Sequence, residues 1–223
     1  MERIADVNGS GIAQSDEVVL RIHDLHKAFG SNKVLKGFDL EVHKGESVMV
    51  LGKSGSGKSV LIKCIIGIVR PDIGSIEVLG ENMLGMDHTR LDHMRVRIGF
   101  LFQSNALYDS MTVRENLEFP MRRHWSGLPA NERNSRVVKA LEDVRLLHTM
   151  DLMPNELSGG MRKRIALART LIMRPDIVLY DEPTTGLDPI TGREIVELIL
   201  ELQRAYGTSS ILISHDLNVA KLA

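Results

Sequence analysis

The chain has 223 residues, enough for one compact unit with a large hydrophobic core. Hydrophobic residues make up 43% of it and charged residues 26%, an ordinary globular composition that excludes disordered, collagen-like and disulfide-scaffold chains. The 28 Lys and Arg residues balance 29 Asp and Glu residues, for a net charge of -1. This balance argues against a protein that holds nucleic acid or anionic lipid by bulk positive charge.

The compartment is constrained by cysteine content and by apolar runs. Cys64 is the single cysteine, so an internal disulfide is impossible and a cytoplasmic setting is expected. Residues 1–17 are polar, lack the apolar region of a signal peptide, and are expected to form a loose tail. Apolar runs such as Cys64–Val69 are far shorter than the ~20 residues of a membrane-spanning helix. Any role at a membrane therefore requires a partner.

Runs rich in β-branched residues alternate with helical patterns along the chain. The predicted strands are Val18–Ile22, Phe38–Val42, Ser47–Leu51, Ser75–Leu79, Ile98–Phe102, Ile177–Tyr180 and Ser210–Ile213. Strands separated by helices are typical of an α/β fold, in which a mainly parallel sheet is covered on both faces.

Two helical patterns carry further detail. Leu61, Cys64, Ile65 and Ile68 repeat at helical spacing and predict a buried stripe that ends at Arg70-Pro71. Further along, Thr112 and Glu115 predict a capping box, and the next helix has one apolar face, formed by Val137, Leu141, Val144 and Leu147. This strand-poor stretch, residues 104–156, is predicted to be a helical subdomain inserted between core segments 18–103 and 157–223.

The segment Gly52–Ser59 reads GKSGSGKS and lies between a predicted strand and a predicted helix, the context of a phosphate-binding loop. Glycines let successive N–H groups point into one concavity, and the helix adds its positive end. Lys58 would neutralise β- and γ-phosphate charge, and the Ser59 hydroxyl suits Mg²⁺. The residues predicted to bind nucleotide here are Gly52, Lys53, Ser54, Gly55, Ser56, Gly57, Lys58, Ser59 and Val60. The alternative is a glycine-rich turn that binds no ligand, but a chance match to this pattern is rare.

A second candidate site lies where the predicted strand Ile177–Tyr180 ends in Asp181 and Glu182. Ligands of α/β proteins bind at the carboxyl ends of such strands. Asp181 would hold Mg²⁺, and Glu182 would orient or deprotonate the water that attacks the γ-phosphate. A strand that ends in Asp-Glu can also be an ordinary solvated turn.

A third candidate, Ser158-Gly159-Gly160, precedes a helix in the position of an N-cap. This end would offer a hydroxyl and free N–H groups to an anion, although such a sequence is also typical of a flexible cap. One side of the helix is apolar, and its other side is expected to be solvated. The basic residues on that side are Arg162, Lys163, Arg164 and Arg169.

Together these motifs resemble the nucleotide-binding subunits of ATP-binding cassette (ABC) transporters. The pieces, in chain order, are Phe29, the phosphate-binding loop, Gln103, the signature Leu157–Met161, Asp181-Glu182, Gly186–Pro189 and Ser214-His215-Asp216. The resemblance runs from Val18 to the end of the chain. It implies a P-loop NTPase with an N-terminal antiparallel β portion, and an ATPase that uses ATP and Mg²⁺. Kinases and GTPases share the loop but lack the signature.

The resemblance also implies roles for single residues. Phe29 would stack on adenine, Gln103 would contact Mg²⁺ and the attacking water, and His215 would bond the γ-phosphate and hold Glu182. Asp188 would lie at the seam of a head-to-tail homodimer, in which Ser158, Gly159 and Gly160 bind the partner's ATP. The residues implied to act in catalysis are Lys58, Gln103, Glu182 and His215, and those implied to hold Mg²⁺ are Ser59, Gln103 and Asp181.

The sequence departs from the family pattern in three places. Phe29 replaces the usual Tyr, which leaves stacking intact, and Met161 stands where many members have Gln. The chain ends eight residues after His215, whereas relatives usually continue, so a truncated C-terminus is expected.

Within the family, Leu101–Leu107, Met153–Met161 and Gly186–Thr191 resemble ATPases of bacterial phospholipid-trafficking and solvent-tolerance systems. Such subunits lie on the cytoplasmic face of the inner membrane, bound to a permease that works with a periplasmic MCE-type lipid carrier. The alternative within transport is an importer or exporter of another solute.

Two further classes compete with a transport ATPase. A soluble ABC protein of ribosomes or DNA usually has a second cassette or a long coiled coil, and neither is present in the sequence, so no nucleic-acid partner is expected. A regulatory module that binds ATP without hydrolysing it is disfavoured by the presence of Glu182 and His215.

Overall fold

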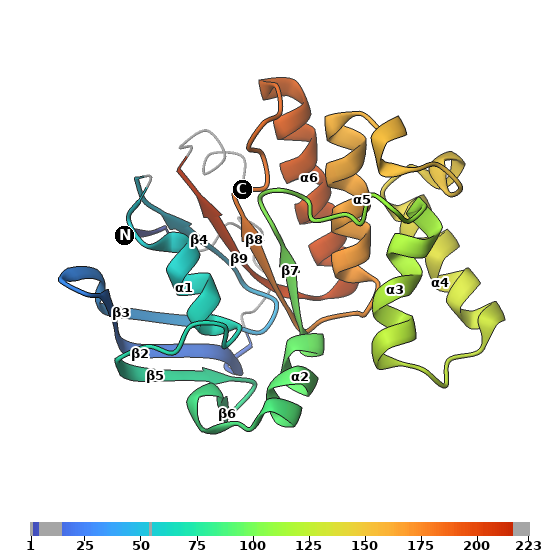
Figure 1. The fold of residues 1–223 in the computed structure, drawn as a ribbon. Coiled ribbons are helices and arrows are strands. Elements are labelled where there is room, and N and C mark those ends of the chain that lie inside the picture. Colours follow the sequence, from blue (N-terminus) through green and yellow to red (C-terminus); the bar gives the residue numbers. More distant parts are fainter. Residues whose placement is uncertain (1, 5–14, 54, 216–223) are drawn as a thin grey trace.

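The computed structural model describes residues 2–4, 15–53 and 55–215 (Figure 1). A five-stranded sheet has the strand order β1-β4-β9-β8-β7. Four of its strands are parallel, namely β4 (Ser47–Leu51), β9 (Ser209–Ser214), β8 (Ile177–Asp181) and β7 (Ile98–Leu101). The carboxyl ends of these strands therefore meet at one edge of the sheet, where the predicted site residues follow them.

The expectation of a loose N-terminal tail is wrong for residues 2–4. Glu2–Ile4 form β1, which pairs antiparallel with Met49–Leu51 of β4. The three residues are too few for a recognisable pattern. Long-range contacts hold β4 in the fold. Its free edge then provides the template for β1.

A second, antiparallel sheet has the order β3-β2-β5-β6. Its strands are β2 (Val18–Phe29), β3 (Asn32–His43), β5 (Ile73–Val78) and β6 (Glu81–Asn82). The predicted segments cover only the first five residues of β2 and, near the end of β3, Phe38–Val42. The rest of each strand is more polar and partly exposed. This sheet confirms the expected antiparallel β portion.

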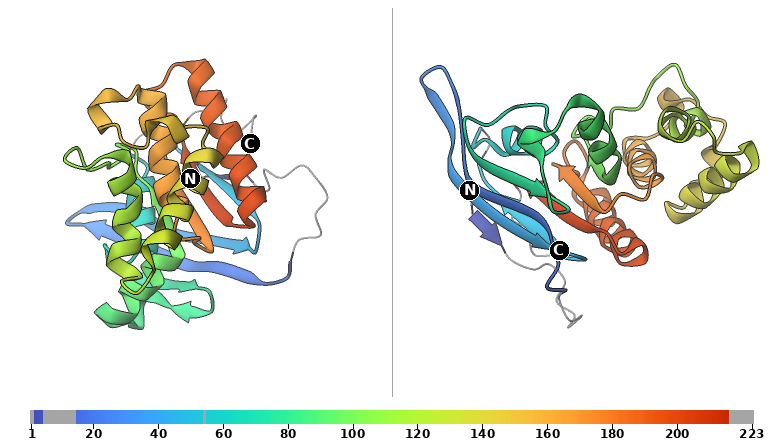
Figure 2. Two further views of the ribbon diagram at one scale, coloured as in Figure 1. Left: turned by 90° about the vertical axis from the view of Figure 1, so that its right-hand side faces the viewer. Right: turned by 90° about the horizontal axis from the view of Figure 1, so that it is seen from below.

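Six α-helices complete the described part of the chain. They are α1 (Lys58–Ile65), α2 (His88–Arg97), α3 (Val113–His124), α4 (Ala130–Asp143), α5 (Gly159–Leu171) and α6 (Pro189–Tyr206). Short 3-10 turns cover Met83–Gly85, Leu147–Thr149 and Pro154–Glu156. The view from below in Figure 2 places the antiparallel sheet at one end of the molecule and α3 and α4 at the other.

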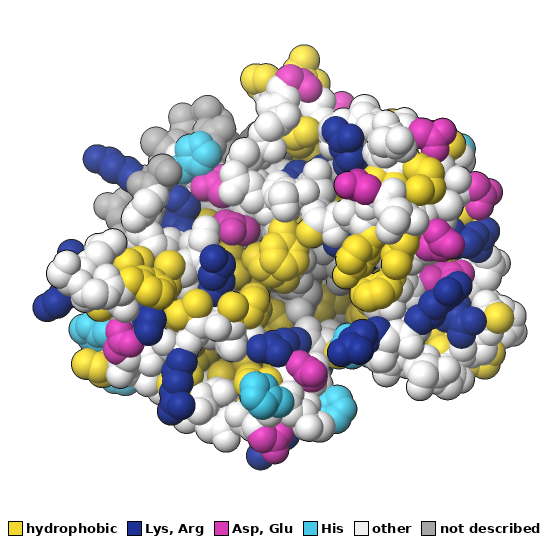
Figure 3. All heavy atoms as spheres, viewed as in Figure 1, with side chains coloured by type: hydrophobic (Ala, Val, Ile, Leu, Met, Phe, Trp, Pro, Cys, Tyr) yellow, Lys and Arg dark blue, Asp and Glu magenta, His cyan; other side chains and the backbone are white. Residues whose placement is uncertain are grey.

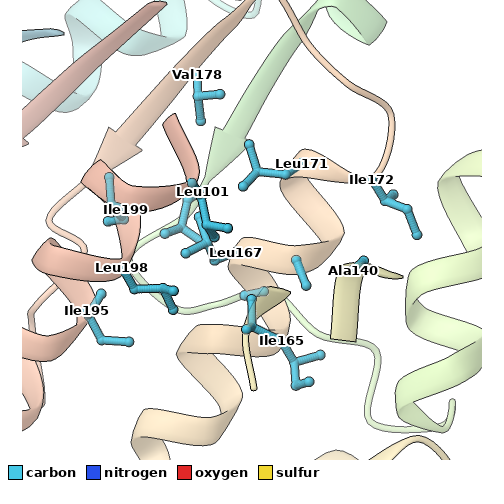
Figure 4. Close-up of a cluster of buried hydrophobic side chains, with 14 of the residues drawn as sticks. Leu101, Ala140, Ile165, Leu167, Leu171, Ile172, Val178, Ile195, Leu198 and Ile199 are labelled. Atoms are coloured by element: carbon cyan, nitrogen blue, oxygen red, sulfur yellow. The ribbon is translucent and has the colours of Figure 1, made fainter. Parts of the chain in front are cut away.

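Two hydrophobic clusters lie on opposite faces of the parallel sheet. Ile177 and Leu179 of β8 pack with α1 and the antiparallel sheet, whereas Val178 and Tyr180 pack on the α3–α6 side. This alternation follows from the pleat of a strand. Figure 4 shows the second cluster, with Leu101 and Val178 of the sheet facing the leucines of α5. A sheet covered on both faces confirms the predicted α/β fold class.

Two predicted helices end earlier than their apolar patterns indicate. α1 ends at Ile65, and Ile68, expected to be buried, is 60% exposed because Gly67 turns the chain at a positive φ of 69°. Likewise α4 ends at Asp143, and Leu147 is 40% exposed. By contrast, the capping box of Thr112 and Glu115 is present at the start of α3.

Between residues 104 and 156 the chain forms only helices and 3-10 turns. None of the described helices combines the length and the apolar character needed to cross a membrane.

Candidate functional site

The phosphate-binding loop ends at the N-terminus of α1, where Gly57 has a left-handed φ of 96° and no side chain to cap the helix. A Cβ atom on Gly57 would lie 2.7 Å from Cγ1 of Val34. Only glycine therefore fits this turn without strain or displacement of β3. The N–H groups of the first turn are left for an external anion. Ser54, which the sequence places in this loop, lies outside the described residues.

Lys58 folds back over the loop. Its Nζ donates hydrogen bonds to the carbonyl oxygens of Gly52 at 2.6 Å and Lys53 at 3.2 Å, and lies 3.6 Å from Oε1 of Glu182. The side chain is 7% exposed. A buried ammonium group needs such partners, and phosphate oxygens would match them in charge and distance.

Asp181 ends β8 opposite the start of α1. Its Oδ2 accepts a hydrogen bond from the Ser59 hydroxyl at 3.3 Å, while Oδ1 is buried without a hydrogen-bond partner among the described residues. Burial raises the pKa of Asp181, opposed by the Ser59 hydrogen bond. A buried carboxylate oxygen that lacks a donor is a suitable ligand for a hard cation, so this pair fits Mg²⁺.

Glu182 and His215 join the ends of two neighbouring strands. His215 Nδ1 lies 2.8 Å from Glu182 Oε2, and the Glu182 N–H donates to the Ile213 carbonyl at 2.9 Å. Glu182 has a positive φ of 50°, which is strained for a residue with a side chain. The structure thus brings together two of the four residues that the resemblance implied for catalysis, at a backbone position that β9 stabilises.

These groups line one cavity of about 440 Å³. Phe29 is 51% exposed at its rim, with Lys27 Nζ 5.4 Å from the ring centroid, so the ring is open to stacking. Gln103 reaches the cavity from the segment after β7. The lining residues are Phe29, Val34, Gly55, Gly57, Lys58, Ser59, Val60, Gln103, Asp181, Glu182, Thr185 and His215. Val34 and Thr185 were not among the predicted site residues, since neither belongs to a recognisable motif.

Ser158, Gly159 and Gly160 are not among these lining residues. Ser158 caps α5 by accepting a hydrogen bond from the Met161 N–H at 3.2 Å. A Cβ on Gly160 would lie 2.8 Å from Cγ2 of Thr191, so the start of α5 packs tightly on the start of α6. Within the described part of one chain, this helix end and the phosphate-binding loop therefore do not share a cavity.

Asp188 caps α6, where its Oδ1 accepts hydrogen bonds from the N–H groups of Ile190 at 3.1 Å and Thr191 at 3.0 Å. Hydrogen bonds from the Thr191 hydroxyl and backbone lower the pKa of Asp188. The residue is exposed, so its carboxylate is accessible to a neighbouring molecule.

Lys163 corrects the expectation of a solvated basic face on α5. Its side chain is 1% exposed, and Nζ donates to the backbone carbonyl of Gln103 at 3.0 Å. Burial lowers its pKa to about 8. The helical repeat contained the signal, because Lys163 lies three and four residues before the buried Ala166 and Leu167.

Comparison with known proteins gives the same assignment as this geometry. The sequence profile described as "ABC transporter" matches residues 35–185. The chain is 40% identical over 203 residues to the intermembrane phospholipid transport system ATP-binding protein MlaF of Escherichia coli (strain K12), covering 91% of this chain and 75% of MlaF. It is 38% identical over 209 residues to the methionine import ATP-binding protein MetN of Rhizobium johnstonii, covering 94% of this chain and 57% of MetN.

Among solved structures, the ATP-binding cassette MJ0796, a dimer in a post-hydrolysis state with ADP and Pi, matches with a TM-score of 0.82 and 32% identity. The match covers 92% of this chain and 91% of MJ0796. Sequence and structure therefore agree, and the chain belongs to the ABC transporter family as one of its ATPases.

Proposed function

We propose that this chain is the motor subunit of a phospholipid transporter, in which a homodimer hydrolyses ATP and moves a membrane permease. The main support for ATP hydrolysis is the cavity at the uncapped end of α1. There the side chains of four residues meet, namely Lys58, Asp181, Glu182 and His215. Its cargo rests on the likeness to MlaF.

The triphosphate binds where the chain supplies positive charge and free N–H groups. Lys58 exchanges its loop carbonyl partners for β- and γ-phosphate oxygens, and the first turn of α1 donates its unpaired N–H groups. Phe29 stacks on the adenine ring at the rim.

Ser59, Asp181 and Gln103 are the residues that would hold Mg²⁺, which supplies charge neutralisation at the phosphates. Glu182 accepts a proton from, or orients, the attacking water. His215 holds the carboxylate of Glu182 in place through the contact at 2.8 Å. The chemistry therefore depends mainly on positioning and charge stabilisation.

The capped end of α5 acts on the nucleotide of a second copy. Ser158, Gly159 and Gly160 offer a hydroxyl and a helix N-terminus but are not among the described residues that line the nucleotide cavity of their own chain. MJ0796 is dimeric with ADP and Pi bound, which supports the same arrangement here. Asp188 lies on α6 beside this end, at the proposed seam.

The permease docks in a groove of about 200 Å³ between the β7 edge and α3. Figure 3 shows hydrophobic side chains on both sides of this hollow, with basic side chains along its lower edge. Tyr108 and Phe119 supply exposed aromatic surface there, and Arg95 and Arg169 supply charge. The occupant is thus a short permease segment with apolar and acidic side chains, which holds this subunit at the cytoplasmic face of the inner membrane.

The test is reconstitution in phospholipid vesicles with a permease and an MCE-type carrier from the same organism. Transfer of fluorescent phospholipid should require ATP and should stop with the Glu182→Gln variant. If ATP is hydrolysed normally but no phospholipid is transferred, the cargo assignment is contradicted.

A second candidate is the import of a small solute, favoured by the 38% identity to MetN. In the same vesicles, turnover stimulated by a soluble binding protein with its amino acid, and not by phospholipid, would establish this function instead.

A further inference from the structure

Two cations on α5 hold backbone carbonyls of the segment that carries Gln103. Lys163 Nζ donates to the Gln103 carbonyl at 3.0 Å, and the Arg169 guanidinium donates to the Ala106 carbonyl at 2.7 Å and to Asn105 at 3.4 Å. The segment between β7 and α3 is therefore tied to α5 at both ends of a four-residue stretch.

This segment needs external support to keep its conformation. Asn105 and Ala106 both have positive φ, 64° and 50°, although neither is glycine. A left-handed backbone is strained for residues with a side chain, more so for Ala106 than for Asn105, unless the surroundings stabilise it. The hydrogen bonds from Arg169 reach the carbonyls of these two residues, so α5 supplies that stabilisation.

The burial of Lys163 is costly for the fold. A lysine that is 1% exposed loses its hydration, and in the described part of the chain its ammonium has one hydrogen-bond acceptor, the Gln103 carbonyl. A methionine would fill the same volume without a desolvation cost. The burial of Lys163 is therefore better explained by its hydrogen bond to Gln103 than by packing alone.

The same helix also carries the end proposed to bind the partner's ATP, since Ser158 lies five residues before Lys163. We propose that Lys163, supported by Arg169, is a positioning residue. It links the position of α5 to the position of Gln103 in the nucleotide cavity of the same chain. Engagement of Ser158 by a partner's nucleotide then sets Gln103 for hydrolysis in its own copy. This inference rests on the proposed dimeric function.

The first test measures the ATPase rate of the Lys163→Met variant, purified together with its permease. We expect kcat to fall about 10-fold through misplacement of Gln103, with the KM for ATP changed less than about 2-fold. Lys163→Gln keeps an N–H donor and should recover part of the loss. Lys139→Met removes an exposed lysine from α4 and serves as the matched control, with unchanged rates. Thermal unfolding checks that each variant is folded.

The second test is a double-mutant cycle with Gln103→Ala. Because Lys163 acts through Gln103, adding Lys163→Met to Gln103→Ala should lower kcat no further. Full additivity of the two effects, or a wild-type kcat in folded Lys163→Met, would overturn the inference while leaving the motor function intact. Wild-type complex that binds but does not hydrolyse ATP would instead contradict the proposed function.

Discussion

The N-termini of α1 and α6 lie at the same edge of the parallel sheet, yet they treat their unpaired N–H groups in opposite ways. In α6, the carboxylate of Asp188 accepts hydrogen bonds from Ile190 and Thr191. In α1, Gly57 supplies no acceptor, and the helix end opens into a cavity with Lys58 and Asp181. One helix carries its own anion, and the other leaves that position for a ligand.

This difference shows how a binding site is distinguished from a structural cap. Both helices follow a strand of the same sheet, so topology alone would make either a candidate anion site. The residue at the N-cap decides, because a side-chain carboxylate at α6 occupies the place that a phosphate takes at α1. Four changes test this comparison, from the largest expected effect to the smallest.

Glu182→Gln should separate chemistry from binding at the α1 site. Loss of the carboxylate removes the group that activates water, so we expect ATP turnover to fall about 10³-fold. The α1 end and Lys58 are untouched, and calorimetry should show ATP affinity within a few-fold of the wild type. Unchanged turnover in the permease complex would remove Glu182 from the catalytic role.

Lys58→Ala should damage the α1 site itself. The variant loses a charge-assisted hydrogen bond to phosphate, so we expect Kd for ATP to rise about 100-fold. A filter-binding or calorimetric titration measures this change. Equal ATP affinity in the variant and the wild type would mean that the nucleotide is held elsewhere.

Gly57→Ala should show that the uncapped turn requires glycine. Its added methyl would lie 2.7 Å from Val34 at a φ of 96°, which we expect to cost about 1–3 kcal/mol of stability. ATP affinity should fall as the loop shifts. Chemical denaturation measures the first effect, and Gly207→Ala, which has no atom within 4 Å of the new Cβ at a φ of 65°, is the control for strain alone.

Asp188→Ala should affect stability at α6 without weakening ATP binding to the free subunit. Loss of this exposed cap should lower Tm by about 2–4 °C. The Thr191 hydroxyl and backbone hold the pKa of Asp188 below its usual value. Its stabilisation is therefore present above the unfolded pKa of about 3.9 and is lost as the pH falls through the lower folded pKa. A similar Tm difference between variant and wild type at pH 7 and at pH 2 would contradict this role.

The sequence predicts features that local chemistry determines. The strand Ser47–Leu51 and the Thr112 capping box depend on adjacent residues, and both occur as predicted. The phosphate-binding loop is also local, and its cavity contains the predicted Gln103 and His215 from distant segments. The resemblance to the ABC family, which the motifs carry, made that grouping predictable.

Other features depend on contacts that no local pattern contains. The hydrogen-bond acceptor of Lys163 is the Gln103 carbonyl, 60 residues away in sequence, and strand β1 requires the free edge of β4. The positive φ of Glu182 is stabilised by β9, which is remote in sequence. Such tertiary contacts override amphipathicity and propensity, so sequence patterns missed them.

The most direct test of the account is the sedimentation of the Glu182→Gln variant with and without ATP and Mg²⁺. If the uncapped end of α1 in one copy and Ser158 of another hold one nucleotide, ATP should convert the monomer to a dimer, and adding Ser158→Arg should prevent this. A variant that binds ATP at saturation and still sediments as a monomer would contradict the shared site.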